Sequence, residues 1–174
     1  MPGPIGHALG GLSTAWATAP RAARSLAIAC AILAAVPDID VLFGGHRGPT
    51  HSVGALAIVT AAAAIFAGAR RLPSGRIAVA CSLAYASHLL LDWLGKDTAP
   101  PHGIMVLWPL TSRYYASGVD LFPEISRRYW KPDEFIVGNL LSLGWELALL
   151  LPIAAIAYFL KARGNAVYRR QNTE

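Results

Sequence analysis

Charged residues are scarce in this sequence of 174 residues. Only 14% are Asp, Glu, Lys or Arg, whereas 55% are hydrophobic, and soluble domains carry roughly 25% charged residues. This shortage disfavours a soluble globular protein, and the abundance of apolar residues excludes intrinsic disorder. The net charge is +5. In so apolar a chain we expect basic residues to orient the protein in a membrane, with no requirement for nucleic acid.

Cysteine is also scarce, and the alternation typical of β-strands is missing. Cys30 and Cys81 each lie in an apolar run. Two thiols form no metal or disulfide framework, so we expect them to pack as small hydrophobic side chains. Met1–Ala19 lacks the basic region and the uninterrupted apolar region of a secretory signal, so we expect it to be retained. Without a two-residue period, the sequence predicts an all-α protein.

Three apolar segments are long enough to cross a bilayer as helices. Ser52–Ala69 contains no charged residue, and Ile77–Leu94 and Ile136–Leu160 contain a single acid each. At about 1.5 Å per residue these helices measure roughly 27, 27 and 38 Å, against a hydrocarbon core of about 30 Å. The sequence therefore predicts an integral membrane bundle with three long transmembrane helices.

Two shorter apolar segments come before the three long ones. Ile5–Ala19 and Ala22–Val36 each suit a helix, with a break at Pro20 and an end at Pro37. Both are short for a membrane span, so we expect an N-terminal helical hairpin that packs against the long helices.

A proline-rich stretch, residues 95–135, predicts a long ordered loop outside the hydrocarbon. Loops of this length are usually functional. Residues 161–174 form a polar tail. Residues 1–174 are therefore expected to form a single membrane-embedded domain.

Ionisable residues beside apolar helices indicate function, and the first group of them is Asp38 and Asp40, directly after Pro37. Carboxylates just beyond a helix C-terminus face the negative end of the helix dipole. This placement is unfavourable unless a cation compensates for it. A metal ion would provide that charge. A solvated turn with an Asx-type cap is the alternative.

The second group comes directly before the apolar segment that starts at Ser52. His46 and His51 flank a Gly-Pro turn, and Thr50 is a candidate N-cap that would place His51 in the first helical turn. The two imidazoles either share a metal site or are ordinary surface histidines. Arg47 beside them suits bidentate binding of a phosphate or a carboxylate.

The third group, His88 and Asp92, lies inside an apolar segment. A spacing of four residues places the imidazole and the carboxylate on one face of a helix. A buried ion pair would explain the pattern at a cost in desolvation, whereas a divalent cation satisfies both groups at once. Metal binding is the favoured interpretation here.

Helix directions place all three groups at one face of the membrane. Nine basic residues lie toward the opposite face and six lie beside the site, five of them in the long loop, where charge controls orientation less strictly. The nine are Arg21, Arg24, Arg70, Arg71, Arg76, Lys161, Arg163, Arg169 and Arg170. We expect a multi-pass protein of a bacterial-type inner membrane, in which the positive-inside rule places the C-terminus in the cytoplasm and the site on the extracytoplasmic face.

Five sequence elements resemble, in order and spacing, the YdjM-like family of membrane-bound metal-dependent hydrolases over about residues 5–110. They are His7, Pro37-Asp38-Ile39-Asp40, His46-Arg47-Gly48-Pro49-Thr50-His51-Ser52, His88-Leu89-Leu90-Leu91-Asp92-Trp93 and Leu107-Trp108-Pro109. That family is distantly similar to zinc-dependent phospholipase C and the single-strand nucleases, all-helical enzymes that cleave phosphoesters with clustered zinc ions.

The resemblance implies a set of metal ligands: His7, one aspartate of the Asp38/Asp40 pair, His51, His88 and Asp92. The later His-x-x-x-Glu pair of the phospholipases is missing. His102 or Glu146 would have to complete a trinuclear site. Glu146 has a second interpretation, a pair with a basic or histidine side chain inside the bundle.

The sequence thus predicts a membrane-bound hydrolase that cleaves a phosphoester, with a membrane lipid as one possible substrate. One or two divalent ions, of which Zn²⁺ best suits imidazole and carboxylate ligands, would activate water. The alternatives are a metal or ion transporter and a scaffold with a structural metal, and clustering at one face favours the enzyme. Candidate catalytic residues are Arg47 and Asp38, and the candidate metal ligands are His7, Asp38, Asp40, His46, His51, His88 and Asp92.

Overall fold

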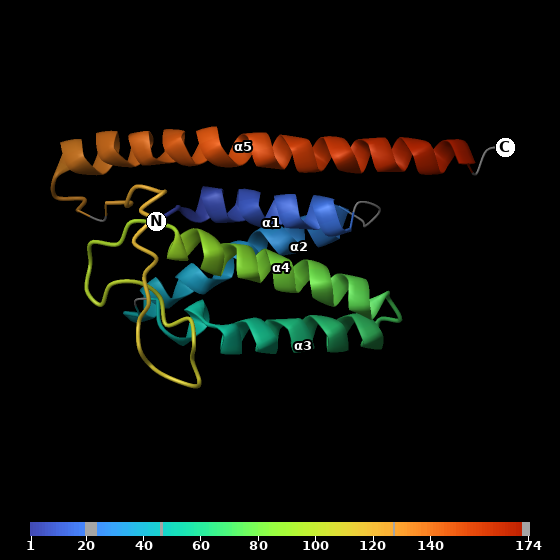
Figure 1. Ribbon diagram of the computed structural model, residues 1–174, viewed down its shortest axis with the longest axis horizontal. Helices are drawn as coiled ribbons and strands as arrows, with labels where there is room; N and C mark the ends of the chain where they lie inside the picture. The colour runs from blue at the N-terminus through green and yellow to red at the C-terminus, as the bar shows by residue number, and fades with distance from the viewer. Residues whose placement is uncertain (20–23, 46, 127, 172–174) are drawn as a thin grey trace.

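The computed structural model describes residues 1–19, 24–45, 47–126 and 128–171. Within these residues the chain is all-helical, as predicted, with no strand (Figure 1). Two 3₁₀ segments, η1 (Val36–Phe43) and η2 (Pro49–His51), lie between the second and third helices. The α-helices are α1 (Pro4–Thr18), α2 (Arg24–Ala35), α3 (Val53–Ala69), α4 (Ser74–Trp93) and α5 (Pro132–Gln171).

In the described part of the chain, three helical segments are long and apolar enough to cross a membrane. This is the predicted number, but one of the three is a different segment from the one predicted. They are Arg24–Phe43, Ser74–Trp93 and Pro132–Ala166, whereas α3 is a shorter apolar helix of 17 residues. Pro37 does not end the helical path as expected, because a proline in the first turn of η1 needs no hydrogen-bond partner for its nitrogen. The α2 helix therefore gains the length of η1.

The α1 helix is the central element of the bundle. It packs against α2, α4 and α5, while α3 packs on α4. Figure 1 shows α5 along one side of the molecule and α3 along the other. Ribbons of α1 and α4 converge with η1 at the end where the chain begins, and the C-terminus lies at the opposite end.

Small residues allow α1 and α2 to approach closely. A Cβ atom at Gly11 would lie 2.3 Å from the carbonyl oxygen of Cys30. Cys30 and Cys81 are free thiols buried among alanines of α1, α2 and α4, in agreement with their expected packing role. Close backbone contact of this kind suits helices in lipid. Hydrophobic burial does not drive helices together there, and small residues allow them to associate by close packing.

The segment between α4 and α5 folds over one end of the bundle. Its described part contains two isolated β-bridges, which pair Gly95 with Phe122 and Ile104 with Tyr115. It also meets the start of α3, because the N–H groups of Val53 and Gly54 donate to carbonyls of this segment at 2.9 and 3.0 Å. These bonds satisfy donors that a helix N-terminus leaves free.

The N-cap of α3 is Ser52, not Thr50 as the sequence suggested. The Ser52 hydroxyl accepts a hydrogen bond from the Ala55 N–H at 3.1 Å, and the Ser52 backbone is extended. Thr50 instead belongs to η2, together with His51. His51 therefore precedes the helix rather than lying in its first turn.

The close contact at Gly11 generates a stability prediction. We expect Gly11→Ala to lower the free energy of unfolding by about 2 kcal/mol, because the added methyl group overpacks the contact between α1 and α2. The control is Gly144→Ala, where a Cβ meets no atom within 4 Å and the helix should be unaffected or more stable. Denaturant titration in detergent micelles measures both. Equal stability of the two variants would contradict the prediction.

Candidate metal centre

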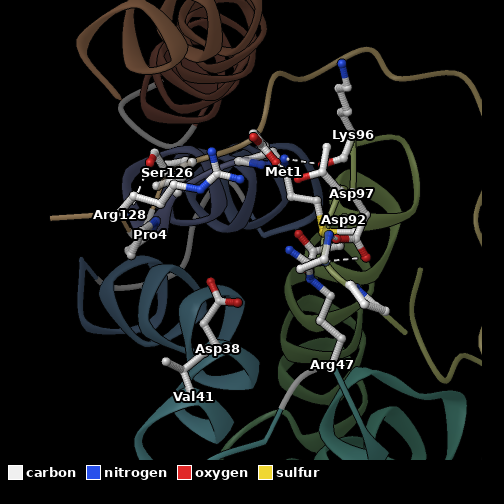
Figure 2. A pocket seen from close by; sticks show the side chains of 17 residues that line it. Met1, Pro4, Asp38, Val41, Arg47, Asp92, Lys96, Asp97, Ser126 and Arg128 are labelled. Carbon is white, nitrogen blue, oxygen red and sulfur yellow. Dashed lines mark hydrogen bonds and ion pairs between the residues drawn. The ribbon is translucent and has the colours of Figure 1, made fainter. Parts of the chain in front are cut away.

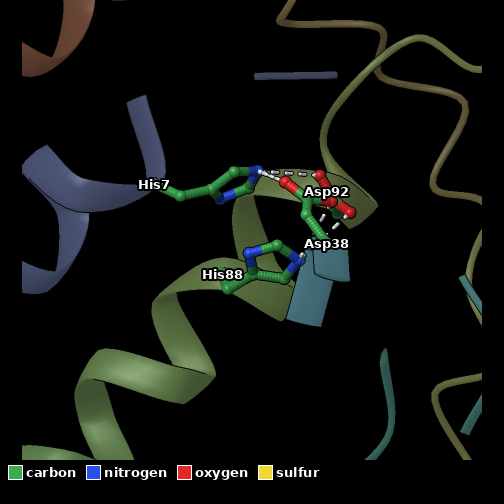
Figure 3. A group of neighbouring side chains, drawn as sticks. All are labelled: His7, Asp38, His88 and Asp92. Carbon is green, nitrogen blue, oxygen red and sulfur yellow. Dashed lines mark ion pairs between the residues drawn. The ribbon is translucent and has the colours of Figure 1, made fainter. Parts of the chain in front are cut away.

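Five predicted site residues meet at one end of the bundle, and we call this group the metal centre: His7, Asp38, His51, His88 and Asp92. One ligand atom from each of His7, Asp38, His88 and Asp92 lies within 4.8 Å of the others (Figure 3). His51 joins them, with its Nε2 atom 3.3 Å from Asp92 Oδ2 and 3.6 Å from Asp38 Oδ1. Four elements of the fold, α1, η1, η2 and α4, thus contribute to one site.

His88 and Asp92 show how local helix geometry builds the centre. Their spacing of four residues brings His88 Nε2 to 3.4 Å from Asp92 Oδ2. The other ring nitrogen, Nδ1, lies 2.7 Å from the Ala34 carbonyl oxygen. Because a carbonyl only accepts, Nδ1 carries the hydrogen and Nε2 turns a lone pair toward the centre. His88 is therefore held in the orientation of a metal ligand.

In each carboxylate of the centre, one oxygen lies near the His7 imidazole and the other lies near the His51 imidazole. Asp92 Oδ1 lies 3.3 Å from His7 Nε2, and its Oδ2 lies 3.3 Å from His51 Nε2. Asp38 repeats the pattern, with Oδ2 3.7 Å from His7 and Oδ1 3.6 Å from His51. The two carboxylates and the imidazoles around them would together hold one or two divalent cations.

Buried polar atoms without hydrogen-bond partners indicate whether the metal centre suits a cation. Among the residues that the structure describes, both ring nitrogens of His7, the Nε2 atoms of His51 and His88, and Asp92 Oδ2 are buried and unpartnered. Each such atom costs free energy when it is removed from water. A divalent cation would satisfy the atoms that face the centre, which are the Nε2 atoms of the three histidines and Asp92 Oδ2, and the mixture of imidazole and carboxylate matches the ligands of zinc. The residues therefore fit the expected metal.

Asp40 lies on the far side of His51 from the centre. Its Oδ2 atom is 3.5 Å from His51 Nδ1, and Thr50 donates a hydrogen bond to the same oxygen at 3.3 Å. The Tyr85 hydroxyl holds this turn by donating to the Thr50 carbonyl. A carboxylate on the second nitrogen of a ligand histidine orients the ring and increases its basicity. The geometry thus gives Asp40 an orienting position, whereas the sequence predicted a direct ligand.

The surrounding carboxylates also change the protonation of His51. Burial lowers the pKa of this imidazole, but the nearby carboxylates of Asp38, Asp40 and Asp92 favour its charged form, outweigh that effect and raise the pKa to about 10. His51 therefore carries a proton at neutral pH when no cation is present. A metal ion must displace that proton to bind, so its affinity rises with pH.

Arg47 lies beside the centre in a constrained conformation. Its backbone is left-handed, with φ of 51°, and its carbonyl accepts a hydrogen bond from the Met105 N–H. The guanidinium forms an ion pair with Asp97, at 2.6 Å from Nη1 to Oδ2, and its Nε lies 3.9 Å from Asp92. These contacts place the positive charge of Arg47 next to the metal centre.

Asp97 is a site residue that the sequence analysis missed. It accepts hydrogen bonds from Arg47 and from the Gly103 N–H at 2.8 Å. Burial raises the pKa of Asp97, but these two bonds bring it below the ordinary value. The residue lies in the long loop, where no periodicity or motif distinguishes it. The only available signal was its position a few residues after Asp92.

A cavity of about 560 Å³ opens next to the metal centre. Asp38, Asp92 and Arg47 form part of its wall, as Figure 2 shows. Lys96 and Arg128 add positive charge on the side of the loop. The side chain of Asp38 is 30% exposed, whereas the three histidines are fully buried. Asp38 is thus the member of the centre most accessible from the cavity.

Two further candidate residues lie outside the metal centre. His102 is exposed, and its Nδ1 atom lies 3.2 Å from the Asp97 carbonyl. Glu146 is fully buried, but its Oε1 atom accepts a hydrogen bond from the Gly3 N–H at 2.8 Å. This carboxylate thus lies at the N-terminus of α1, a favourable position for negative charge in the helix dipole. His46, predicted as a ligand, lies outside the described residues.

The fold and this cluster define the class: a helical membrane protein with a candidate metal centre at one end of its bundle. A family model described as YdjM inner membrane protein matches residues 1–166, so the chain belongs to this family. The resemblance found in the sequence motifs is therefore confirmed. Comparisons with curated proteins and with solved structures produced no match.

The unpartnered His88 Nε2 generates a metal-binding prediction. We expect His88→Ala to lower the affinity for Zn²⁺ at least tenfold, because it removes a ligand already oriented by Ala34. His102→Ala, at an exposed histidine outside the centre, is the matched control and should bind as wild type. Calorimetric titration of metal-free protein measures both affinities. Unchanged affinity in His88→Ala would show that this group does not hold the ion.

Proposed function

We propose that the protein is a membrane-bound, metal-dependent hydrolase that cleaves a phosphoester. The observation that carries this proposal is the contact between the metal centre and the cavity through Asp38. Structural zinc sites are closed by protein ligands, whereas catalytic sites keep one position open. A centre with buried histidines and one accessible carboxylate suits the second type.

Residues of the chain would divide the work of hydrolysis. A divalent cation held by the centre would supply Lewis acidity and lower the pKa of water at the site. Asp38 faces both the cavity and the centre, so it is placed to accept a proton from the attacking water. Arg47 would bind the phosphate charge and stabilise it as the bond breaks. Asp97 would act indirectly, as the residue that positions Arg47.

The composition of the cavity supports a lipid as the source of the phosphoester. Pro2, Pro4 and Ile125 contribute apolar wall next to the cations Lys96 and Arg128. This wall lies at the end of a bundle whose helices are long enough to cross a membrane. A lipid headgroup at the bilayer surface would combine the negative charge and the apolar neighbourhood that such a cavity accepts.

The packing of the rest of the bundle supports hydrolysis over ion transport. A transport path needs polar groups that continue through the middle of the membrane. Beyond the metal centre, the core cluster between α1, α2 and α4 consists of Ala15, Ala19, Cys30, Ala80, Cys81 and Ala84. A hydrated ion would meet apolar side chains there.

A screen of the zinc-loaded protein against phosphodiesters and phosphomonoesters, including lipid substrates, tests the proposal. We expect Arg47→Lys to fold and bind zinc but to lose about a hundredfold in activity, because an ammonium group cannot bind phosphate in bidentate fashion. Arg70→Lys is the control, at an arginine that lies over the Phe66 ring. Wild-type activity in Arg47→Lys would remove Arg47 from the mechanism, and a metal-loaded protein without activity would contradict the hydrolase.

The distribution of basic residues supports an extracytoplasmic position for the centre. We expect Ser112→Cys, in a Cys30→Ala and Cys81→Ala background, to react with a membrane-impermeant maleimide in intact spheroplasts. Gln171→Cys should react only after lysis, because the C-terminal end of α5 lies at the opposite end of the bundle. The reverse labelling pattern would place the centre in the cytoplasm.

A further inference from the structure

A second hollow lies at the end of the bundle away from the metal centre. It is an open groove of about 970 Å³, lined by the last part of α1, the first part of α2 and the C-terminal half of α5. Figure 1 shows these three parts together at the end where α1 stops and α2 begins. The proposed hydrolysis does not use this groove.

The position of the groove along α5 places it near the other membrane face. Glu146 lies beside the N-terminus of α1, at the end with the metal centre. Lys161, which lines the groove, follows fifteen residues later on the same helix. At about 1.5 Å per residue the two are separated by roughly 22 Å, most of a hydrocarbon core of about 30 Å. The groove therefore faces the leaflet opposite the metal centre.

The charge of the groove is positive. Arg24 and Lys161 both line it, and none of the described residues in its wall is acidic. This contrasts with the cavity at the metal centre, where Asp38, Asp92 and Asp97 offset the cations. The groove therefore favours a ligand that carries negative charge.

Aromatic and apolar residues complete the wall. The Lys161 ammonium lies 5.9 Å from the centre of the Trp16 ring, and Trp16 meets Tyr158 edge to face at 5.2 Å. Tryptophan and tyrosine are enriched where a membrane helix meets the lipid headgroups. Leu12 and Ile28 extend the wall with apolar surface, and Ile28 is 58% exposed. The groove thus presents a charged region and an apolar region side by side.

We propose that this groove binds an anionic phospholipid from the leaflet opposite the metal centre. The phosphate lies between Arg24 and Lys161, and an acyl chain follows the apolar wall formed by Leu12 and Ile28. Basic pockets between membrane helices recognise anionic headgroups by this combination of charge and apolar contact. A soluble anion would use the cations alone and leave the apolar wall without a partner.

The test uses the full chain in nanodiscs of equimolar phosphatidylcholine and phosphatidylglycerol. Native mass spectrometry counts the lipids that each variant retains after release. We expect wild type to retain phosphatidylglycerol preferentially and the Arg24→Gln, Lys161→Gln double variant to lose about tenfold in that preference. The control double variant, Arg70→Gln, Arg71→Gln, removes the same charge outside the groove and should behave as wild type.

A charge-conserving variant separates lipid binding from loss of structure. Arg24→Lys with Lys161→Arg keeps both positive charges and should retain the preference for phosphatidylglycerol. The proposal is overturned if the glutamine variant in the groove binds phosphatidylglycerol as wild type does, or if the control variant loses the preference equally. Inorganic phosphate is the probe for a simple anion site. Displacement of the lipid by inorganic phosphate alone would also overturn the proposal.

Discussion

The burial of three imidazoles and the Asp92 carboxylate beside the partly exposed Asp38 is the constraint on which this structure depends. His7, His51 and His88 carry no water-facing surface, and their inward nitrogens have no hydrogen-bond partner within the described chain. Such a group is unfavourable by itself, since desolvated polar atoms lose the hydrogen bonds that water would supply. The same arrangement becomes favourable around a cation. Folding of the bundle therefore brings together residues that could hold a positive ion.

Most contacts around the metal centre serve to hold its residues in place. Ala34 orients His88 through its carbonyl, and Tyr85 holds the turn that carries His51. The loop between α4 and α5 supplies Asp97, which ties Arg47 to the edge of the cavity. Helices thus provide the ligands, and the loop provides the charged surroundings. Such a division is common where a rigid scaffold carries a site and connecting segments complete it.

Sequence reasoning succeeded where one helix determined the geometry. The spacing of His88 and Asp92 alone predicted that they share a face, and the structure confirms it. It did less well where chain direction depends on local turns. Pro37 reads as a helix end but opens a 3₁₀ helix, and Ser52 rather than Thr50 caps α3.

Contacts between distant segments were the least predictable part. The partnership of Arg47 and Asp97 follows from the path of a loop, which has no periodic pattern. The position of Glu146 against α1 depends in the same way on how α5 packs. Composition and spacing therefore predict where helices lie along the chain, but they leave open which helices pack against each other.

The bond between Glu146 and Gly3 links α5 to the N-terminus of α1, the helix that carries His7. The Gly3 carbonyl accepts a hydrogen bond from the backbone N–H of His7 at 3.1 Å. The Gly3 N–H donates to Glu146. One peptide segment thus connects α5 with the backbone of the helical turn that carries His7. The outward face of α5 presents many exposed apolar residues, including Leu141 and Ile156, to the surrounding lipid. The position of α5 in the membrane and the position of the first turn of α1 are therefore coupled through a single buried hydrogen bond.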